Sequence, residues 1–449
     1  MKDLITVIPD RTPTLVLLRP DAVWDAHRDP NIGASLLILI ERHHDQLTRL
    51  QTLQCSPSLD APSGTLTLPL PGTILLPGFV NAHTHLDLTA IGPRPRPAES
   101  AFAAWLDTVR TSRPQSEPDI AAAVRQGVER SLAGGVVAVG DIAGCTSTGP
   151  TLAPWHTLAA SPLAGVSFLE FFAIGNRAHD RIAHLHQLLN SIASQPPTSH
   201  TTRLGLSPHS PYSAEPSAFD AALQLASAHN LPLTTHLAET LDERNFIQHA
   251  QGPHRTFLES LSLFPPPTSA HFGLGHHPIE HLAPYLARAH WLCAHCNDCP
   301  DHALAILARS RASVAYCPRA SDYFNAPHFL GPHRYRDMLA AGINVCLGTD
   351  SIINLPADPH DQSTGSLSTL DEARLLIHRD DLDPQTALAM LTTNGARALG
   401  LDPIAWTFTP GAPLAGIVAL PAGPNPADAL TATHKPALLA ICAASTTHP

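Results

Sequence analysis

The stretch LLPGFVNAH, at Leu75–His83, is a short apolar run that ends in a polar residue. Seven further runs of this kind follow it along the chain: VVAVGD (Val136–Asp141), GVSFLE (Gly165–Glu170), RLGLS (Arg203–Ser207), LPLTTH (Leu231–His236), HWLCAH (His290–His295), ASVAYC (Ala312–Cys317) and INVCLGTD (Ile343–Asp350). Segments with helical spacing, such as 119–132 and 216–228, lie between the runs. This alternation predicts an α/β fold, a (β/α)8 TIM-like barrel over residues 76–404. A doubly wound open sheet is the alternative, but no glycine-rich phosphate loop follows any run.

The two ends of the chain have a different pattern. Residues 1–75 and 405–449 carry short apolar runs separated by proline and glycine, for example Thr14–Leu18 and Gly416–Leu420. Such runs are typical of β-strands in a small domain. We therefore expect a small β-sandwich domain formed by both termini, with a structural role.

Composition excludes several classes of function. Charged residues make up 14% of the 449 residues, and the formal net charge is -11 with no basic run, so we expect no binding to nucleic acid. The most apolar run, Leu36–Ile40, is far too short to span a membrane. Lys2 and Lys435 are the only lysines, which excludes a Schiff-base lysine, a phosphate-loop lysine and a carboxylated lysine bridging two metals. We expect a cytoplasmic protein, with a homodimer as a possible assembly.

Three of the eight cysteines have a regular spacing: Cys293, Cys296 and Cys299, called here the cysteine trio. The spacing is compatible with a structural zinc or an iron–sulfur site. However, Cys293 lies inside the apolar run Ala289–Cys296, and no second pair of matching spacing follows. Buried free thiols are the preferred interpretation.

The motif Asn81-Ala82-His83-Thr84-His85 ends the first predicted barrel strand. Because side chains alternate along a strand, His83 and His85 point to the same face and could share one metal ion. The pattern is weak by itself, since a chain with 28 histidines contains such pairs by chance.

Later strand ends supply further ligands. His236, followed by Glu239, ends one run, and His295 ends another. Asp350 closes the last run, where a buried carboxylate is costly unless it is paired or bound to metal. Three histidines and one aspartate would form a single divalent site with a position open for water, as catalytic sites have. The alternatives are a helix N-cap for Asp350 and a first-turn helix carboxylate for Glu239.

These motifs resemble the amidohydrolase superfamily, specifically its metal-dependent deaminase and chlorohydrolase branch. The residues that carry the resemblance are Leu76–His85, Ser207–Tyr212, His236–Glu239, His295–Asn297, Cys317–Arg319 and Leu347–Ser351. The resemblance implies that His83, His85, His236 and Asp350 bind one divalent ion, Zn2+ or Fe2+. It also implies that Glu239 transfers protons, that His295 orients the attacking water, and that Asp350 accepts a proton from this water. A metal ion would supply hydroxide at neutral pH by lowering the pKa of bound water to near 7.

Within this branch the sequence is most similar to the deaminases of aminodeoxyfutalosine, a step of menaquinone biosynthesis, and of S-adenosylhomocysteine and adenosine. The resemblance implies a small-molecule substrate with an adenine-type ring, contacted by His209, Trp105, Glu170 and Arg319. Arg319 could bind the benzoate of aminodeoxyfutalosine or pair with Asp322. The other three could instead be a loop-fixing histidine, a core tryptophan and a paired barrel carboxylate.

The sequence departs from the family pattern at two places. Ala320-Ser321 replaces a small polar pair after Arg319, which bears on substrate identity, and Gly416 replaces an aspartate near a strand of the β-domain. Two alternative functions therefore remain: another purine deaminase or triazine-type chlorohydrolase of the same branch, and a catalytically inactive metal-binding scaffold.

Overall fold

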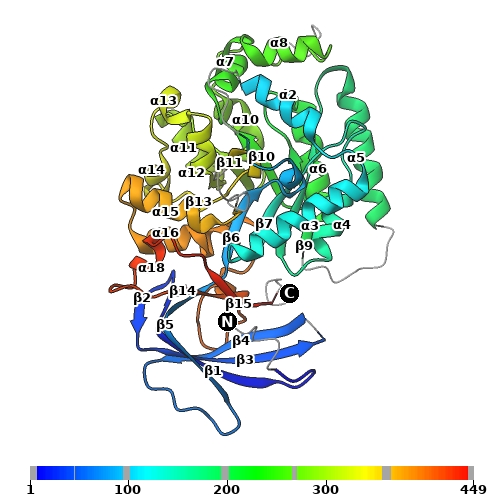
Figure 1. The fold of residues 1–449 in the computed structure, drawn as a ribbon. Coiled ribbons are helices and arrows are strands. Elements are labelled where there is room, and N and C mark those ends of the chain that lie inside the picture. The colour runs from blue at the N-terminus through cyan, green and yellow to red at the C-terminus, as the bar shows by residue number, and fades with distance from the viewer. Residues whose placement is uncertain are drawn as a thin grey trace.

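The computed structural model describes residues 8–44, 46–94, 102–193, 202–264, 270–355 and 366–442. Parts of the two predicted terminal segments, 1–7 and 443–449, lie outside the described residues. Figure 1 shows a ring of strands and helices, with a separate sheet below it that contains strands from both ends of the chain. No helix in the described ranges combines the length and the hydropathy that a membrane crossing needs.

The ring is an eight-stranded parallel barrel, which confirms the predicted fold. Its strands in order are β6 (Phe79–Thr84), β7 (Val136–Ala143), β8 (Ala164–Phe171), β9 (Thr202–Pro208), β10 (Leu233–Leu237), β11 (Trp291–His295), β12 (Ser313–Tyr316) and β13 (Asn344–Leu347). Each strand pairs with its neighbours in sequence, and a bridge between Thr84 and Asp350 joins the last strand end to the first. These strands are buried along their whole length or at all but one residue.

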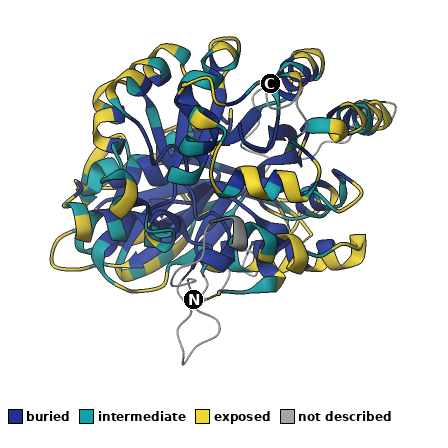
Figure 2. Ribbon diagram, turned by 90° about the horizontal axis from the view of Figure 1, so that it is seen from above, coloured by how far each residue is buried: buried dark blue, intermediate teal, exposed yellow. Residues whose placement is uncertain are grey.

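Helices surround the barrel. They are η1 (Leu86–Ile91), α2 (Phe102–Ser112), α3 (Glu117–Ala133), α4 (Ala153–Ala159), η2 (Gly175–Arg177), α5 (Ala178–Ala193), α6 (Pro216–His229), α7 (Leu241–His249), α8 (Pro253–Ser260), α10 (Pro278–Leu286), α11 (Asp301–Ser310), α12 (Pro318–Tyr323), α13 (Ala326–Leu330), α14 (Tyr335–Ala340), η3 (Ile352–Asn354), α15 (Thr369–Asp380), α16 (Pro384–Leu391), α17 (Thr393–Ala398), η4 (Pro403–Trp406) and α18 (Asp428–Thr431). Figure 2, a view from above, shows buried strands at the centre and exposed residues mainly on the outer helices.

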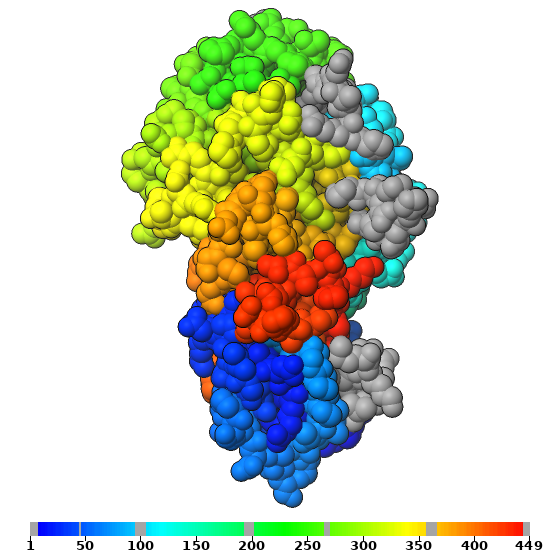
Figure 3. All heavy atoms as spheres, turned by 60° about the vertical axis from the view of Figure 1, so that its left-hand side comes forward, coloured from blue at the N-terminus to red at the C-terminus, as the bar shows by residue number. Residues whose placement is uncertain are grey.

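The ends of the chain form a second sheet of seven strands. These are β1 (Thr14–Asp25), β2 (Arg28–Ile32), β3 (Ser35–His43), β4 (Gln46–Ser56), β5 (Leu66–Pro77), β14 (Gly416–Pro421) and β15 (Ala437–Ile441). Hydrogen bonds join them in a single sheet, in which β14 pairs with β5. Figure 3 shows the C-terminal residues in red between the blue N-terminal strands and the orange helices. The domain limits at residues 75 and 405 stay a prediction.

The first predicted barrel run spans two strands of the structure. Leu75 and Leu76 belong to β5 and pair with β14 in the second sheet, whereas β6 begins only at Phe79. The change of sheet occurs at Gly78, whose N–H donates to Gly416 O at 3.0 Å, while the N–H of Phe79 donates to Gly135 O at 2.9 Å. A Cβ at Gly78 would lie 2.4 Å from a Val137 methyl, so this crossing has no room for another residue.

Candidate active site

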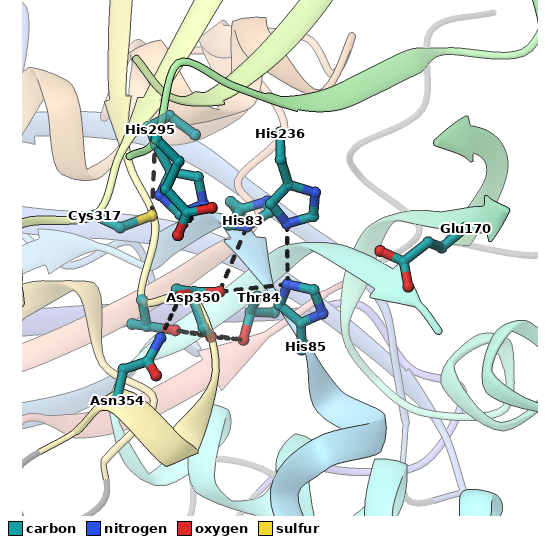
Figure 4. A network of polar contacts seen from close by, with 12 residues as sticks. His83, Thr84, His85, Glu170, His236, His295, Cys317, Asp350 and Asn354 are labelled. Atoms are coloured by element: carbon teal, nitrogen blue, oxygen red, sulfur yellow. Dashed lines mark hydrogen bonds and ion pairs between the residues drawn. The ribbon is translucent and has the colours of Figure 1, made fainter. Parts of the chain in front are cut away.

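Four of the predicted site residues meet at the mouth of the barrel. His83 lies in β6, His85 follows it, His236 lies in β10 and Asp350 follows β13, and all four are buried. Asp350 Oδ1 lies 3.7 Å from His83 Nε2 and 3.3 Å from His85 Nε2. His236 Nε2 lies 3.3 Å from His85 Nε2. Figure 4 shows His83 and His85 facing the Asp350 carboxylate, with His236 facing His85.

Closure of the barrel places the last ligand beside the first two. The N–H groups of Thr349 and Asp350 both donate to His83 O, at 3.0 and 3.1 Å, and Thr84 Oγ1 donates to Asp350 O at 3.1 Å. Asn81 adds to this junction, because its Oδ1 accepts from Thr349 N–H at 3.0 Å. The motifs at residues 81–85 and 348–351, far apart in the sequence, are therefore held together by main-chain hydrogen bonds.

The chain leaves three of these strands through left-handed backbone. Ala238, His295 and Asp350 have φ angles of 52°, 69° and 55°. Left-handed φ is uncommon for residues other than glycine and costs on the order of 1–3 kcal/mol where it is imposed. Such strain often marks functional sites. Here it lies at the ends of β10, β11 and β13, where the chain turns and the side chains enter the cavity.

The charge states of the four residues suit a divalent cation. Burial lowers the pKa of His83 and brings that of His236 well below its usual range. Burial acts to raise the pKa of Asp350, but its interactions with the nearby imidazoles of His83 and His85 outweigh burial and hold that pKa well below its usual range. Burial acts to lower the pKa of His85, but Asp350 outweighs it, so that pKa is raised. A cation bound here would oppose protonation of His85, because an imidazole binds a metal ion through an unprotonated nitrogen.

The hydrogen bonds of the imidazoles also fit metal binding. His236 Nδ1 donates to His209 O at 3.0 Å, which leaves Nε2 as the atom with a lone pair. Within the described residues, neither ring nitrogen of His83 has a hydrogen-bond partner, and Nδ1 of His85 has none. Buried polar atoms are rarely left without partners in proteins, so these nitrogens point to a ligand.

Glu239 and His295 lie beside this cluster. His295 Nε2 is 3.7 Å from Glu239 Oε1, and Asn297 Nδ2 donates to Glu239 O at 3.0 Å. Burial, and then the charges of Asp350 and Glu243, raise the pKa of Glu239 well above its usual range. Burial lowers the pKa of His295 to about 3. The raised pKa favours the protonated form of Glu239, and His295 is neutral at neutral pH.

The structure does not support Glu239 as the first-turn carboxylate of a helix, or Asp350 as a helix N-cap. Helix α7 is capped by Thr240, and the carboxylate in its first turn that binds main-chain N–H groups is Glu243, at 2.8 Å from the N–H groups of both Ala238 and Glu239. The residue before η3 is Ser351, and the Asp350 carboxylate faces the histidines and Asn354.

A cavity of about 470 Å³ extends from the histidine cluster toward the outer helices. Its near end contains His85, His236, Glu239, His295 and Asp350. Its far wall is apolar and comes largely from α2 and the segment from α8 to Leu263: Trp105, Leu106, Val109, Phe257, Leu258, Leu261 and Leu263. Arg177 and Arg181, at the start of α5, also line it. The cavity thus offers proton-transfer groups at one end and apolar and cationic groups at the other.

A sequence profile described as "Amidohydrolase family" matches residues 74–420. The chain belongs to the amidohydrolase family. The matched segment includes the whole barrel and every residue of the cluster described above.

Relatives of this amidohydrolase include several named deaminases. An adenosine deaminase of Helicobacter pylori is 25% identical over 337 residues, 74% of this chain and 75% of that protein. An aminodeoxyfutalosine deaminase of Deinococcus radiodurans is 28% identical over 343 residues, 73% and 74% of the two chains. A 5-methylthioadenosine/S-adenosylhomocysteine deaminase of Halalkalibacterium halodurans is 31% identical over 210 residues, which is 44% of this chain and only 40% of that protein.

Solved structures show the same fold. The crystal structure of Helicobacter pylori aminofutalosine deaminase matches with a TM-score of 0.72 at 19% identity, covering 97% of this chain and 100% of that one. The zinc complex of the atrazine chlorohydrolase TrzN from Arthrobacter aurescens matches with a TM-score of 0.68 at 20% identity, covering 96% and 94% of the two chains.

Three of the four predicted substrate contacts line the cavity of this amidohydrolase. The His209 ring lies between those of Phe172 and His236, at centroid distances of 4.4 and 4.8 Å, and its Nδ1 is 2.6 Å from Ser213 Oγ. Glu170 is nearby, with Oε1 3.9 Å from His209 Nε2. Trp105 lines the cavity and also packs edge-on against Phe324, 5.0 Å away, so it is at once a wall residue and a packing residue. The side chains of residues 102–104 lie outside the described residues.

The structure does not place Arg319 among the residues that line the cavity, and its role as a substrate contact stays a prediction that this geometry does not support. Arg319 Nε donates to Glu372 Oε1 at 2.5 Å, and its main-chain N–H donates to Glu372 Oε2 at 2.9 Å. Its Nη2 donates to Ser368 O at 3.2 Å. The alternative pairing with Asp322 is wrong, because Asp322 binds Arg379 at 2.9 Å. The Arg319 side chain instead joins α12 to α15, because it forms an ion pair with the buried carboxylate of Glu372 on α15.

Sequence reasoning missed the arginines that line the cavity: Arg110, Arg113, Arg177 and Arg181. Arg113 follows α2 and pairs with Glu170. The two residues are far apart in the sequence, so no local sequence pattern predicts this pair. Arg177 and Arg181 are four residues apart, the spacing that places two side chains on one helix face, and this signal was available in the sequence.

The cysteine trio lies in the main hydrophobic core, with all three residues buried. The candidate metal clusters found in the described residues do not include any of the three. These observations agree with buried free thiols.

Proposed function

We propose that this amidohydrolase releases ammonia from the adenine ring of a nucleoside whose far end carries an apolar group and an anion. The observation that carries the proposal is the two-ended cavity, with a histidine–aspartate cluster and Glu239 at one end and, at the other, Arg177 and Arg181, which form no ion pair with a carboxylate of the described residues. The family and its deaminase relatives support a hydrolase that acts on carbon–nitrogen bonds.

His83, His85, His236 and Asp350 would hold one divalent cation, because together they offer three imidazole nitrogens and an ionised carboxylate. Such an ion supplies Lewis-acid activation of a water molecule. Nitrogen-rich sites of this kind suit Zn2+ and Fe2+, and we propose one of these two as the native metal.

The remaining chemistry falls to side chains of the barrel rim. Asp350, which is ionised, can take a proton from the attacking water, and Glu239, whose raised pKa favours the protonated form, can give its own proton to a ring nitrogen of the substrate. This protonation makes the attacked carbon more electrophilic. His295 Nε2 is buried without a hydrogen-bond partner in the described residues, so it can hydrogen-bond the oxygen that adds to the ring. Glu239, ionised after this step, can then pass the proton held by Asp350 to the amine, which leaves as ammonia, and Glu239 regains its own proton from the oxygen added to the ring.

The far end of the cavity narrows the choice of substrate. Arg181 donates to the carbonyl oxygens of Ser147 and Thr148, and neither it nor Arg177 forms an ion pair with a carboxylate of the described residues. The described carboxylates that line the cavity are Glu170, Glu239 and Asp350, none of them on the far wall. An aromatic acid therefore fits this end better than an amino-acid group, whose ammonium would need an acidic partner. Among the candidate substrates, aminodeoxyfutalosine, which carries a benzoate, has this character.

Ammonia release from a panel of adenine compounds, measured together with metal content, tests the proposal. We expect about one metal ion per chain and the highest kcat/KM for aminodeoxyfutalosine, followed by adenosine and S-adenosylhomocysteine. Activity on triazines but on no purine would favour a chlorohydrolase. Stoichiometric metal without hydrolysis of any ring amine would favour an inactive scaffold. A cytoplasmic location and a homodimer stay predictions.

A further inference from the structure

Arg113 lies between two buried carboxylates beside the cavity. Its Nε is 3.3 Å from Asp87 Oδ2, and its Nη1 is 3.2 Å from Glu170 Oε2. The Nη1 group also donates to Cys145 O at 3.4 Å. The side chains of Arg113, Asp87 and Glu170 are 9%, 2% and 1% exposed, so this is a buried cluster with one positive and two potential negative charges.

The cluster depends on a glycine. A Cβ built at Gly144 would lie 2.3 Å from Arg113 Nη1 and 2.5 Å from Asp87 Oδ2, closer than real Cβ atoms approach other atoms. Only glycine therefore leaves room for the guanidinium and the Asp87 carboxylate beside the end of β7.

Arg113 engages one oxygen of Glu170 and leaves the other for a ligand. Oε1 of Glu170 is buried and has no hydrogen-bond partner in the described residues, and the residue lines the cavity. Figure 4 shows the carboxylate of Glu170 pointing toward His85 and His236. Burial acts to raise the pKa of Glu170, but the charges of His209 and Arg113 outweigh it and lower that pKa. An ionised oxygen buried without a donor is costly, so the site is suited to a ligand that brings one.

The proposed substrate class limits what that donor can be. In an adenine that carries a sugar on its ring nitrogen, the only hydrogen-bond donor of the base is the amino group, and the reaction requires this group to lie at the metal end. The hydroxyls of the sugar are the remaining donors near the middle of the cavity.

We propose that Arg113 is a positioning residue, which with Gly144 holds Glu170 so that its Oε1 accepts hydrogen bonds from the sugar hydroxyls of the nucleoside. This inference rests on the proposed function. It assigns sugar recognition to Glu170 and assigns the orientation of the Glu170 side chain to Arg113, which acts through that carboxylate.

Two nucleosides that differ only in these hydroxyls test the inference: adenosine and 2′,3′-dideoxyadenosine. For the wild-type enzyme we expect kcat/KM to be about 100-fold higher for adenosine, the value of a hydrogen bond to a charged group. Arg113→Gln should reduce this ratio to below about tenfold, by lowering kcat/KM for adenosine much more than for the dideoxy compound. An equal loss for both compounds would make Arg113 a structural residue only and would overturn the inference.

A double variant shows whether Arg113 acts through Glu170. The ratio for Glu170→Gln combined with Arg113→Gln should equal the ratio for Glu170→Gln alone. A further fall in the ratio would contradict the inference. Gly144→Ala should reproduce the loss of sugar discrimination, since it displaces the guanidinium without removing a charge.

Arg113→Gln leaves two buried carboxylates unpaired and could prevent folding. Arg113→Lys keeps the positive charge but loses the planar guanidinium that reaches both carboxylates. We therefore expect a folded enzyme in which the adenosine/dideoxyadenosine ratio of kcat/KM falls by about tenfold. An unchanged ratio in this variant would also overturn the inference. Arg125→Gln, at an exposed position of α3, is the control and should keep the wild-type ratio. If the wild-type enzyme deaminates neither nucleoside, the proposed function itself fails, which is distinct from a changed ratio.

Discussion

The two ends of the cavity are built in different ways. The metal end consists of residues at the ends of β6, β10, β11 and β13, whose positions follow from hydrogen bonds around a closed barrel. The far end consists of side chains from α2, α5 and α8, which no strand holds in register. The chemistry is therefore carried by the most constrained part of the fold and substrate choice by the part most open to change, a division common in barrel enzymes.

The largest expected effect is at the metal end. His85→Asn removes an imidazole that lies 3.3 Å from both Asp350 and His236, so bound metal and activity should be lost together. Metal analysis and an ammonia assay with added Zn2+ measure both quantities. Retention of one metal ion per chain with substantial turnover would remove His85 from the ligand set.

Glu239→Gln should separate proton transfer from metal binding at the same end. The amide cannot carry the proton that the buried carboxyl holds, so kcat should fall by about 1,000-fold or more while metal content stays unchanged. Steady-state kinetics with metal analysis check this result. A variant with nearly normal kcat would exclude Glu239 from the mechanism.

Changes at the far end should affect substrate choice and leave the chemistry intact. Arg177→Met removes an exposed charge at the start of α5, and kcat/KM for a nucleoside with an anionic far end should fall by about 10-fold to 100-fold. The value for adenosine, which lacks such a group, is the internal control and should change little. Equal losses for both substrates would show that Arg177 acts on the fold and does not recognise the anion.

The smallest effect concerns Asp141, which lies in β7 near the metal end but does not line the cavity. Burial, and then the charge of Asp87, raise the pKa of Asp141 to about 7. Between the pKa of an unfolded aspartate, near 4, and this value the folded state holds a proton that the unfolded state releases, so stability falls as pH rises. Asp141→Asn should remove this fall and raise Tm at pH 8 by about 2–4 °C, with a smaller change at pH 4.5.

The amide introduced by Asp141→Asn would keep an acceptor for the N–H of Leu86, which donates to Asp141 Oδ1 at 3.0 Å in the native protein. Thermal unfolding at the two pH values measures the difference. A shift in Tm of the same size at both values would contradict the assignment of the raised pKa to Asp141.

Much of the metal end was predictable because strand ends are local features. A buried apolar run that ends in a histidine or an aspartate predicts where a strand lies, where it ends and which way the polar side chain points. In a parallel barrel these strand ends meet at one rim. His83, His85, His236 and Asp350 could be found in this way, and so could Glu239 and His295. At the far end the sequence offered only the four-residue spacing of Arg177 and Arg181, which does not report that their side chains face a cavity. Arg319 follows a family motif but is held by Glu372, which lies fifty-three residues further along the chain.

By itself the sequence determined the order of strands, the barrel and the residues at its rim, because hydrophobic alternation and strand-end polarity are properties of neighbouring residues. Only the tertiary structure decided that Leu75 and Leu76 pair with β14, that Ala238, His295 and Asp350 adopt left-handed backbone, and which arginines face the cavity. These outcomes depend on contacts between segments far apart in the chain, such as Arg113 with Glu170, and on the space that one glycine leaves between them.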